Sequence, residues 1–148
     1  MDYEASFADF RQLVSLQAPH VDVFLIETMS NITEAKAALA AVKETAVPAY
    51  VGLTVADDGT NTLRSGETLP QAIDQLFPLG PAGLMINCSV PEAVSAAMSQ
   101  LKDLPIPFGG YANGFTSIDA LRPGGTVASL RARSDPVSYT HLTLPTIE

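Results

Sequence analysis

The sequence has 148 residues, which suits one ordinary domain and falls short of the about 250 residues of a complete (β/α)₈ barrel. An apolar fraction of 47% argues against intrinsic disorder, and a net charge of -8 disfavours nucleic acid as a partner because an acidic surface repels phosphate. No apolar run is long enough for a membrane span. The single cysteine excludes an internal disulfide and fits a cytoplasmic protein.

Helical and strand-like patterns alternate along the chain, beginning with a helix. The apolar faces of the predicted helices recur at i, i+3, i+4 and i+7. These faces are Tyr3, Phe7, Phe10 and Val14; Ala35, Ala38, Leu39 and Val42; Leu69, Ala72, Ile73 and Leu76; and Val94, Ala97, Met98 and Leu101. Each of the four helices is followed by one short apolar run of strand length, so helices and runs alternate strictly. The four runs are residues 21–26, 49–55, 83–86 and 106–111.

Local signals mark three of the helix starts. Residues 89–92, Ser-Val-Pro-Glu, predict a capping box with a proline in the first turn. Residues 31–34 and 68–71 predict similar, weaker caps, led by Asn31 and Thr68.

Strands that alternate with helices indicate a parallel sheet with right-handed crossovers. Two architectures fit this α/β pattern: an open doubly wound sheet, and part of a closed barrel. No G-x-G-x-x-G or Walker-type loop follows a predicted strand, which disfavours nucleotide binding without deciding between the two architectures.

Polar side chains follow the predicted strands at their carboxyl ends, where parallel α/β folds bind ligands. They include Glu27, Asn87 with Cys88, and Tyr111 with Asn113. A carboxylate, amides, a thiol and a phenol on one rim suit the binding of a small polar molecule, with a thiolate available as a metal ligand.

Each of these residues also has a purely structural interpretation. A single cysteine is more often a small buried hydrophobic residue than a ligand. Glu27 could cap the following helix, the two asparagines could satisfy backbone groups at turns, and Tyr111 could pack in the core.

Taken together, four stretches resemble the homocysteine S-methyltransferase family. They are residues 22–29, Asp-Val-Phe-Leu-Ile-Glu-Thr-Met; residues 66–69, Gly-Glu-Thr-Leu; residues 83–89, Gly-Leu-Met-Ile-Asn-Cys-Ser; and residues 111–114, Tyr-Ala-Asn-Gly. The family folds as a (β/α)₈ barrel and transfers a methyl group from a small donor to the sulfur of homocysteine, which gives methionine. The resemblance therefore implies a partial (β/α)₈ (TIM) barrel with about four parallel strands.

The resemblance also implies roles for particular residues. In the family, three cysteine thiolates hold Zn²⁺, and the homocysteine thiol takes the fourth position, where the metal stabilises it as a thiolate. Cys88 corresponds to the first of these ligands, and Glu27 to the residue that holds the homocysteine amino group. Asn87 shapes the same pocket, with Tyr111 and Asn113 beside it. No residue is assigned as an acid–base or nucleophilic catalyst.

The sequence departs from the family pattern in three respects. It has no second cysteine, whereas the family's other two zinc ligands lie in a Gly-Gly-Cys-Cys motif on the last strand. The family's opening strand with its Asp-Gly turn is also absent. Residues 1–135 are therefore interpreted as part of a homocysteine-binding barrel domain that is inactive by itself. Residues 136–148 form an atypical tail that resembles translated sequencing-adapter sequence.

Two other functions remain open from the residues alone. One is a barrel lyase or aldolase in which Glu27 is the acid–base group and Cys88 is structural. No lysine ends a predicted strand, which disfavours a Schiff-base mechanism. The other is a non-catalytic α/β binding module. The methyl donor also stays open among methylfolates, S-methylmethionine, S-adenosylmethionine and betaine.

Overall fold

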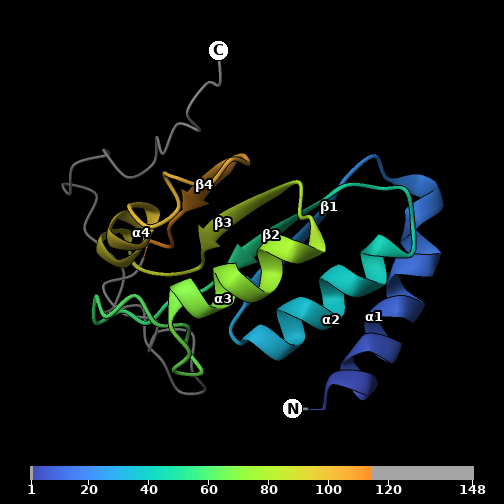
Figure 1. The fold of residues 1–148 in the computed structure, drawn as a ribbon, viewed down its shortest axis with the longest axis horizontal. Coiled ribbons are helices and arrows are strands. Elements are labelled where there is room, and N and C mark those ends of the chain that lie inside the picture. The colour runs from blue at the N-terminus through green and yellow to red at the C-terminus, as the bar shows by residue number, and fades with distance from the viewer. Residues whose placement is uncertain (1, 115–148) are drawn as a thin grey trace.

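The structure, a computed structural model, describes residues 2–114 and shows helices and strands in the predicted alternation (Figure 1). Two short 3₁₀ helices extend the first and third α-helices, and no helix in this part of the chain is long and apolar enough to cross a membrane. The elements are α1 (Tyr3–Gln17), η1 (Ala18–His20), β1 (Phe24–Met29), α2 (Ile32–Lys43), β2 (Ala49–Leu53), α3 (Leu69–Leu76), η2 (Phe77–Leu79), β3 (Gly83–Asn87), α4 (Pro91–Met98) and β4 (Phe108–Tyr111).

The four strands form one parallel sheet in the order β1-β2-β3-β4. Each strand pairs with the next one in the chain, as neighbouring strands do in a barrel, whereas a doubly wound sheet reverses its strand order at a switch point. The fold is therefore a partial (β/α)₈ barrel, which confirms the expected fold class. The predicted tail, residues 136–148, lies outside the described residues.

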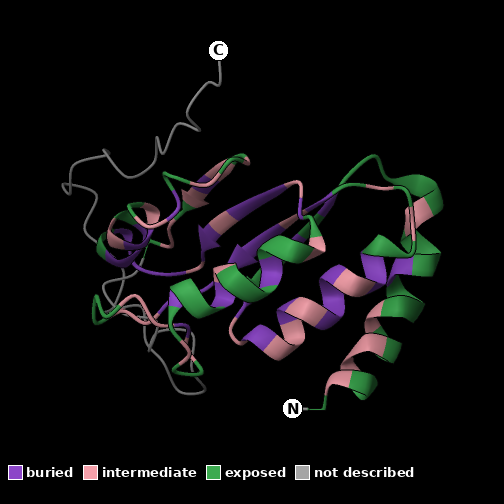
Figure 2. Ribbon diagram, viewed as in Figure 1, coloured by how far each residue is buried: buried purple, intermediate pink, exposed green. Residues whose placement is uncertain are grey.

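The two faces of the sheet differ in burial because side chains alternate along each strand. On the face that α2, α3 and α4 cover, Val51, Leu53, Leu84 and Ile86 are completely buried (Figure 2). On the opposite face, the Leu25 side chain is 50% exposed. This second face corresponds to the interior of a closed barrel, where residues from further strands would cover it.

The helices bury the apolar faces that the sequence predicts. Val14 of α1 is buried, and Phe7 and Phe10 pack against the core from the same face. All four predicted α2 positions are buried, and so are three of the four predicted positions around each of α3 and α4. Burial of these faces, more than intrinsic helix propensity, holds short helices such as α3 and α4 in place.

Two of the three predicted helix caps are confirmed. Asn31 accepts a hydrogen bond from the Glu34 amide at 2.8 Å, and Thr68 forms a complete capping box with Gln71. The predicted box at residues 89–92 is wrong, because Val90 is the N-cap of α4 and no side chain bonds there. The Ser89 hydroxyl instead accepts the amide of Val55 at 2.9 Å, beyond the end of β2. A tertiary partner has displaced the local one.

All four strands differ from the predicted runs at one or both limits, and β2 and β3 end at Leu53 and Asn87 instead of residues 55 and 86. β1 begins at Phe24 instead of residue 21, and β4 begins at Phe108 instead of residue 106. Val21 and Val23 are 37% and 47% exposed and lie outside the ladder, so their apolar character does not mark a paired strand. β1 continues instead to Met29, past residue 26 where the predicted run ends.

Candidate ligand-binding rim

Glu27, Asn87 and Tyr111 meet at the carboxyl end of the sheet, although they come from three different strands. The parallel register places Asn87 directly beside Tyr111. The Asn87 Nδ2 group donates to the Tyr111 hydroxyl at 3.0 Å, and that hydroxyl donates in turn to Oε1 of Glu27. We call these three residues the rim cluster. The prediction that these side chains converge is confirmed, and the interpretation of Tyr111 as a core residue is wrong.

Asn87 reaches across β2 to the end of β1. Its Oδ1 atom accepts the Thr28 amide at 3.1 Å, and its Nδ2 atom donates to the Thr28 hydroxyl at 3.0 Å. Gly52 of β2 lies beneath this side chain, and a Cβ atom at position 52 would come within 3.0 Å of Oδ1 of Asn87. The absence of a side chain at Gly52 therefore leaves the space that Asn87 needs. Asn87 is 1% exposed, so its bonds are shielded from water.

A β-bulge presents Glu27 to the rim. Ile26 pairs with Val51 and Met29 pairs with Leu53, so two residues of β1 lie opposite Gly52 alone. The second of them, Thr28, has a φ of 62°, which is unusual for a β-branched residue. Bulges of this kind redirect side chains and are common next to ligand sites. Because the Asn31 side chain already caps α2, Glu27 is not needed as its cap.

Cys88 follows β3 directly and is half-buried, with a free thiol. Its φ of 51° places it in the left-handed region, a second unusual conformation at this rim. Cys88 directly follows Asn87 of the rim cluster in the chain. Asn113 lies just beyond β4, and its amide donates to the Ser89 carbonyl at 3.0 Å, which brings the ends of β3 and β4 together.

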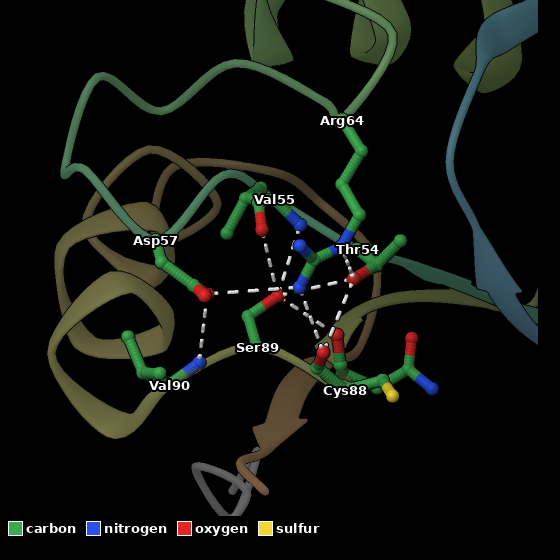
Figure 3. A network of polar contacts seen from close by, with 8 residues as sticks. Thr54, Val55, Asp57, Arg64, Cys88, Ser89 and Val90 are labelled. Atoms are coloured by element: carbon green, nitrogen blue, oxygen red, sulfur yellow. Dashed lines mark hydrogen bonds and ion pairs between the residues drawn. The ribbon is translucent and has the colours of Figure 1, made fainter. Parts of the chain in front are cut away.

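Arg64 belongs to the same end of the sheet and was not predicted from the sequence. It lies in the loop between β2 and α3 and donates to Oγ1 of Thr54 at 2.9 Å and to the Cys88 carbonyl at 3.1 Å (Figure 3). Asp57 lies 3.6 Å from the same guanidinium. The only signal in the sequence is that Arg64 closely precedes the family-like stretch at residues 66–69.

The surroundings of Tyr111 raise the pKa of its hydroxyl above the ordinary value of about 10. Burial is the largest cause, followed by the hydrogen bond to Glu27 and the negative charge of that carboxylate, while the bond from Asn87 acts in the opposite direction. A phenolate could no longer donate to Glu27 and would be repelled by it. The bond between Tyr111 and Glu27 therefore stabilises the fold below pH 10, and this contribution is lost as pH rises through the raised pKa.

We expect Glu27→Gln to lower the pKa of Tyr111, because the substitution removes the charge that opposes ionisation. Alkaline titration of phenolate absorbance measures this shift, and Tyr111→Phe identifies which phase belongs to Tyr111. Glu44→Gln is the matched control, since Glu44 pairs with Arg11 on the surface. A Tyr111 phase that stays in place in Glu27→Gln would contradict the assigned hydrogen bond.

The rim does not by itself form a metal site. Among residues 2–114, no three His, Cys, Asp or Glu side chains are close enough together to hold a metal ion. The whole sequence has one cysteine, whereas a catalytic zinc site needs three protein ligands. Residues 2–114 therefore do not provide a complete zinc centre.

The geometry suits a small ligand with a positively charged group. Glu27 supplies a carboxylate that a charge-assisted bond can engage, and Asn87 and Tyr111 fix the position of that carboxylate. Cys88 is the residue that follows Asn87 of this cluster. The fold is thus a partial (β/α) barrel whose polar rim lies at the carboxyl ends of its strands, where barrels of this kind bind their ligands.

Comparison with known proteins identifies the family. The sequence model of the homocysteine S-methyltransferase family matches residues 1–134, so the chain belongs to this family. A comparison with curated proteins gave no match.

Two solved structures of the homocysteine methyltransferase MmuM from Escherichia coli are similar to this chain. The apo form is 26% identical with a TM-score of 0.67, over 76% of this chain and 44% of that chain. The oxidized form is 22% identical with a TM-score of 0.61, over 78% of this chain and 41% of that chain. The chain thus spans less than half the length of the solved structures that it matches.

Proposed function

We propose that this chain is the part of a zinc-dependent homocysteine S-methyltransferase that binds the amino group of homocysteine and contributes one zinc ligand. The observation that carries this proposal is the rim cluster, in which Tyr111 and Asn87 hold the Glu27 carboxylate and Asn87 directly precedes Cys88. The carboxylate of Glu27 binds the homocysteine ammonium group. Asn87 and Tyr111 orient that carboxylate, and Asn113 lies at the border of the pocket. Family membership supports the choice of homocysteine over other amino acids.

The metal belongs to the complete enzyme in this proposal. Cys88 is one thiolate ligand, and the other two cysteines come from outside the 148 residues. The chain alone therefore binds no zinc tightly and forms no methionine. A cytoplasmic location suits thiolate ligands, which must stay reduced. The methyl donor is a small molecule whose class is determined by parts of the barrel that lie beyond this chain.

A Schiff-base lyase is a weaker candidate. Lys36 donates to Gln75 of α3, and Lys43 lies beside the Gly80 carbonyl, so both side chains are held among the helices. Lys102 is exposed beyond α4. None of these lysines is placed at a strand end, where such an enzyme needs its amine.

The test compares this chain with the complete enzyme, by which we mean the product of the longest genomic reading frame that contains this sequence. We expect the complete enzyme to retain zinc and to form methionine from homocysteine with one of the four donor classes. The 148-residue chain should form none and should lose zinc on mild chelation. The control is the complete enzyme stripped of zinc and then reloaded.

Two results would overturn the proposal. Stoichiometric zinc in the isolated chain after chelation would show that Cys88 does not depend on ligands from elsewhere. A zinc-loaded complete enzyme that forms no methionine with any donor class would rule out the proposed reaction.

A further inference from the structure

Arg64 holds the backbone at Cys88 through a shielded set of polar contacts. Its Nη2 group donates to the Cys88 carbonyl at 3.1 Å, and its Nε group donates to Thr54 at 2.9 Å. Thr54 also donates to the Cys88 carbonyl, at 3.3 Å. The side chains of Arg64 and Asp57 are 21% and 20% exposed, so their ion pair is only weakly screened by salt. The carbonyl of Cys88 thus has two donors that fix its direction.

The residues that follow Cys88 are fixed by the same loop. The Ser89 hydroxyl accepts the Val55 amide at 2.9 Å and donates to the Val55 carbonyl at 3.1 Å. The Val90 amide lies 3.5 Å from Oδ1 of Asp57. The residues just after β2 and in the loop before α3 therefore contact three consecutive residues: the backbone of Cys88 and Val90, and the side chain of Ser89.

These contacts maintain a conformation that Cys88 would not adopt readily by itself. A residue with a Cβ atom rarely has a φ near 51° unless its surroundings impose it. In Figure 3 the Cys88 sulfur lies on the side of the residue away from the Arg64 guanidinium. The Cys88 carbonyl points toward Arg64, so the carbonyl and the thiol lie on different sides of the residue.

We propose that Arg64 is a positioning residue, which holds the Cys88 carbonyl and thereby keeps Cys88 in the left-handed conformation that directs its thiol away from the guanidinium. The consequence for zinc binding rests on the proposed function, in which Cys88 is a ligand. The conformational role does not depend on it. A guanidinium suits this role because its planar, rigid donors can engage Thr54, Asp57 and Cys88 at once, whereas a lysine ammonium is a point charge on a flexible stem.

The sign of φ at Cys88 can be measured directly by NMR, since the one-bond Cα–Hα coupling differs between positive and negative φ. We expect the 148-residue chain to show the positive-φ coupling at both Cys88 and Thr28. Arg64→Ala should abolish it at Cys88 and leave it at Thr28, because Asn87 holds Thr28 independently. Thr28 is thus a control within the same molecule. A general loss of structure would abolish the positive-φ coupling at Thr28 as well as at Cys88.

The reactivity of the thiol provides a second measurement. Cys88 is the only cysteine, so its alkylation rate with iodoacetamide can be followed without interference. We expect Arg64→Ala to change this rate at least about threefold, whereas Arg11→Ala, which removes an exposed arginine paired with Glu44, should leave it unchanged. Arg64→Lys should give an intermediate rate.

A positive-φ coupling that persists at Cys88 in folded Arg64→Ala protein would overturn the proposal. If Arg64→Ala does not fold, Thr54→Val supplies the same test, since it removes one donor to the Cys88 carbonyl and one acceptor for Arg64. Neither measurement uses zinc or homocysteine. The positioning role can therefore hold when the complete enzyme forms no methionine, and it can fail when the enzyme is active.

Discussion

Replacing Cys88 by serine in the complete enzyme is expected to abolish both zinc retention and methionine formation. The hydroxyl of serine stays protonated at neutral pH and cannot replace a thiolate ligand. The loss of activity should exceed the roughly 10- to 100-fold loss that follows when a residue hydrogen-bonded to a metal ligand is replaced, because here the ligand itself is removed. Metal analysis of the purified protein and a methionine assay measure the two effects.

Serine is a close match to cysteine in size, so the backbone conformation at position 88 should persist in this variant. A melting temperature close to that of the parent would show that the fold is intact. The matched control is Ser99→Ala on the surface beyond α4, which should leave zinc and activity unchanged. An active Cys88→Ser enzyme with bound zinc would return Cys88 to a structural role and favour a different chemistry at this rim.

Replacing Glu27 by glutamine in the complete enzyme is expected to weaken homocysteine binding by about 1.5–3 kcal/mol, which is the usual contribution of a hydrogen bond to a charged group. This corresponds to a rise in KM for homocysteine of roughly ten- to a hundredfold. The kcat value should change little, because the amino group takes no part in the methyl transfer and its binding is equal in the ground and transition states. Steady-state kinetics at varied homocysteine concentration separates the two parameters.

Glu44→Gln is the control for this substitution as well, because it removes a carboxylate from an exposed ion pair far from the rim. Such pairs contribute little to stability. A fall in kcat with an unchanged KM would contradict the assignment of Glu27 to the amino group. That outcome would instead favour the role of an acid–base group.

The rim cluster could be predicted because it depends on a general rule. The carboxyl ends of neighbouring parallel strands lie at one edge, so polar residues at the ends of three apolar runs had to come together. The apolar periodicity of the helices was equally informative, since Ala35, Ala38, Leu39 and Val42 bury the predicted face.

The remaining features depend on tertiary partners that no local pattern shows. Ser89 fits a capping box in sequence but bonds to Val55 in space. Arg64 lies in a loop without periodicity, and its role emerges only when the end of β3 lies beside it. The bulge at Thr28 depends on pairing with β2, because the spacing of apolar residues in β1 does not reveal an extra residue.

The bulge in β1 has a further consequence for the strand as a whole. Ile26 and Met29 are both buried, although in a regular strand side chains three positions apart point to opposite faces. The alternation of side chains therefore shifts by one residue between them, at the bulge. Phe24 and Ile26 before the bulge and Met29 after it all pack in the buried core. Glu27 and Thr28 are thereby left outside the core, so the two side chains at this end of the strand are separated from the buried ones that hold the strand in the sheet.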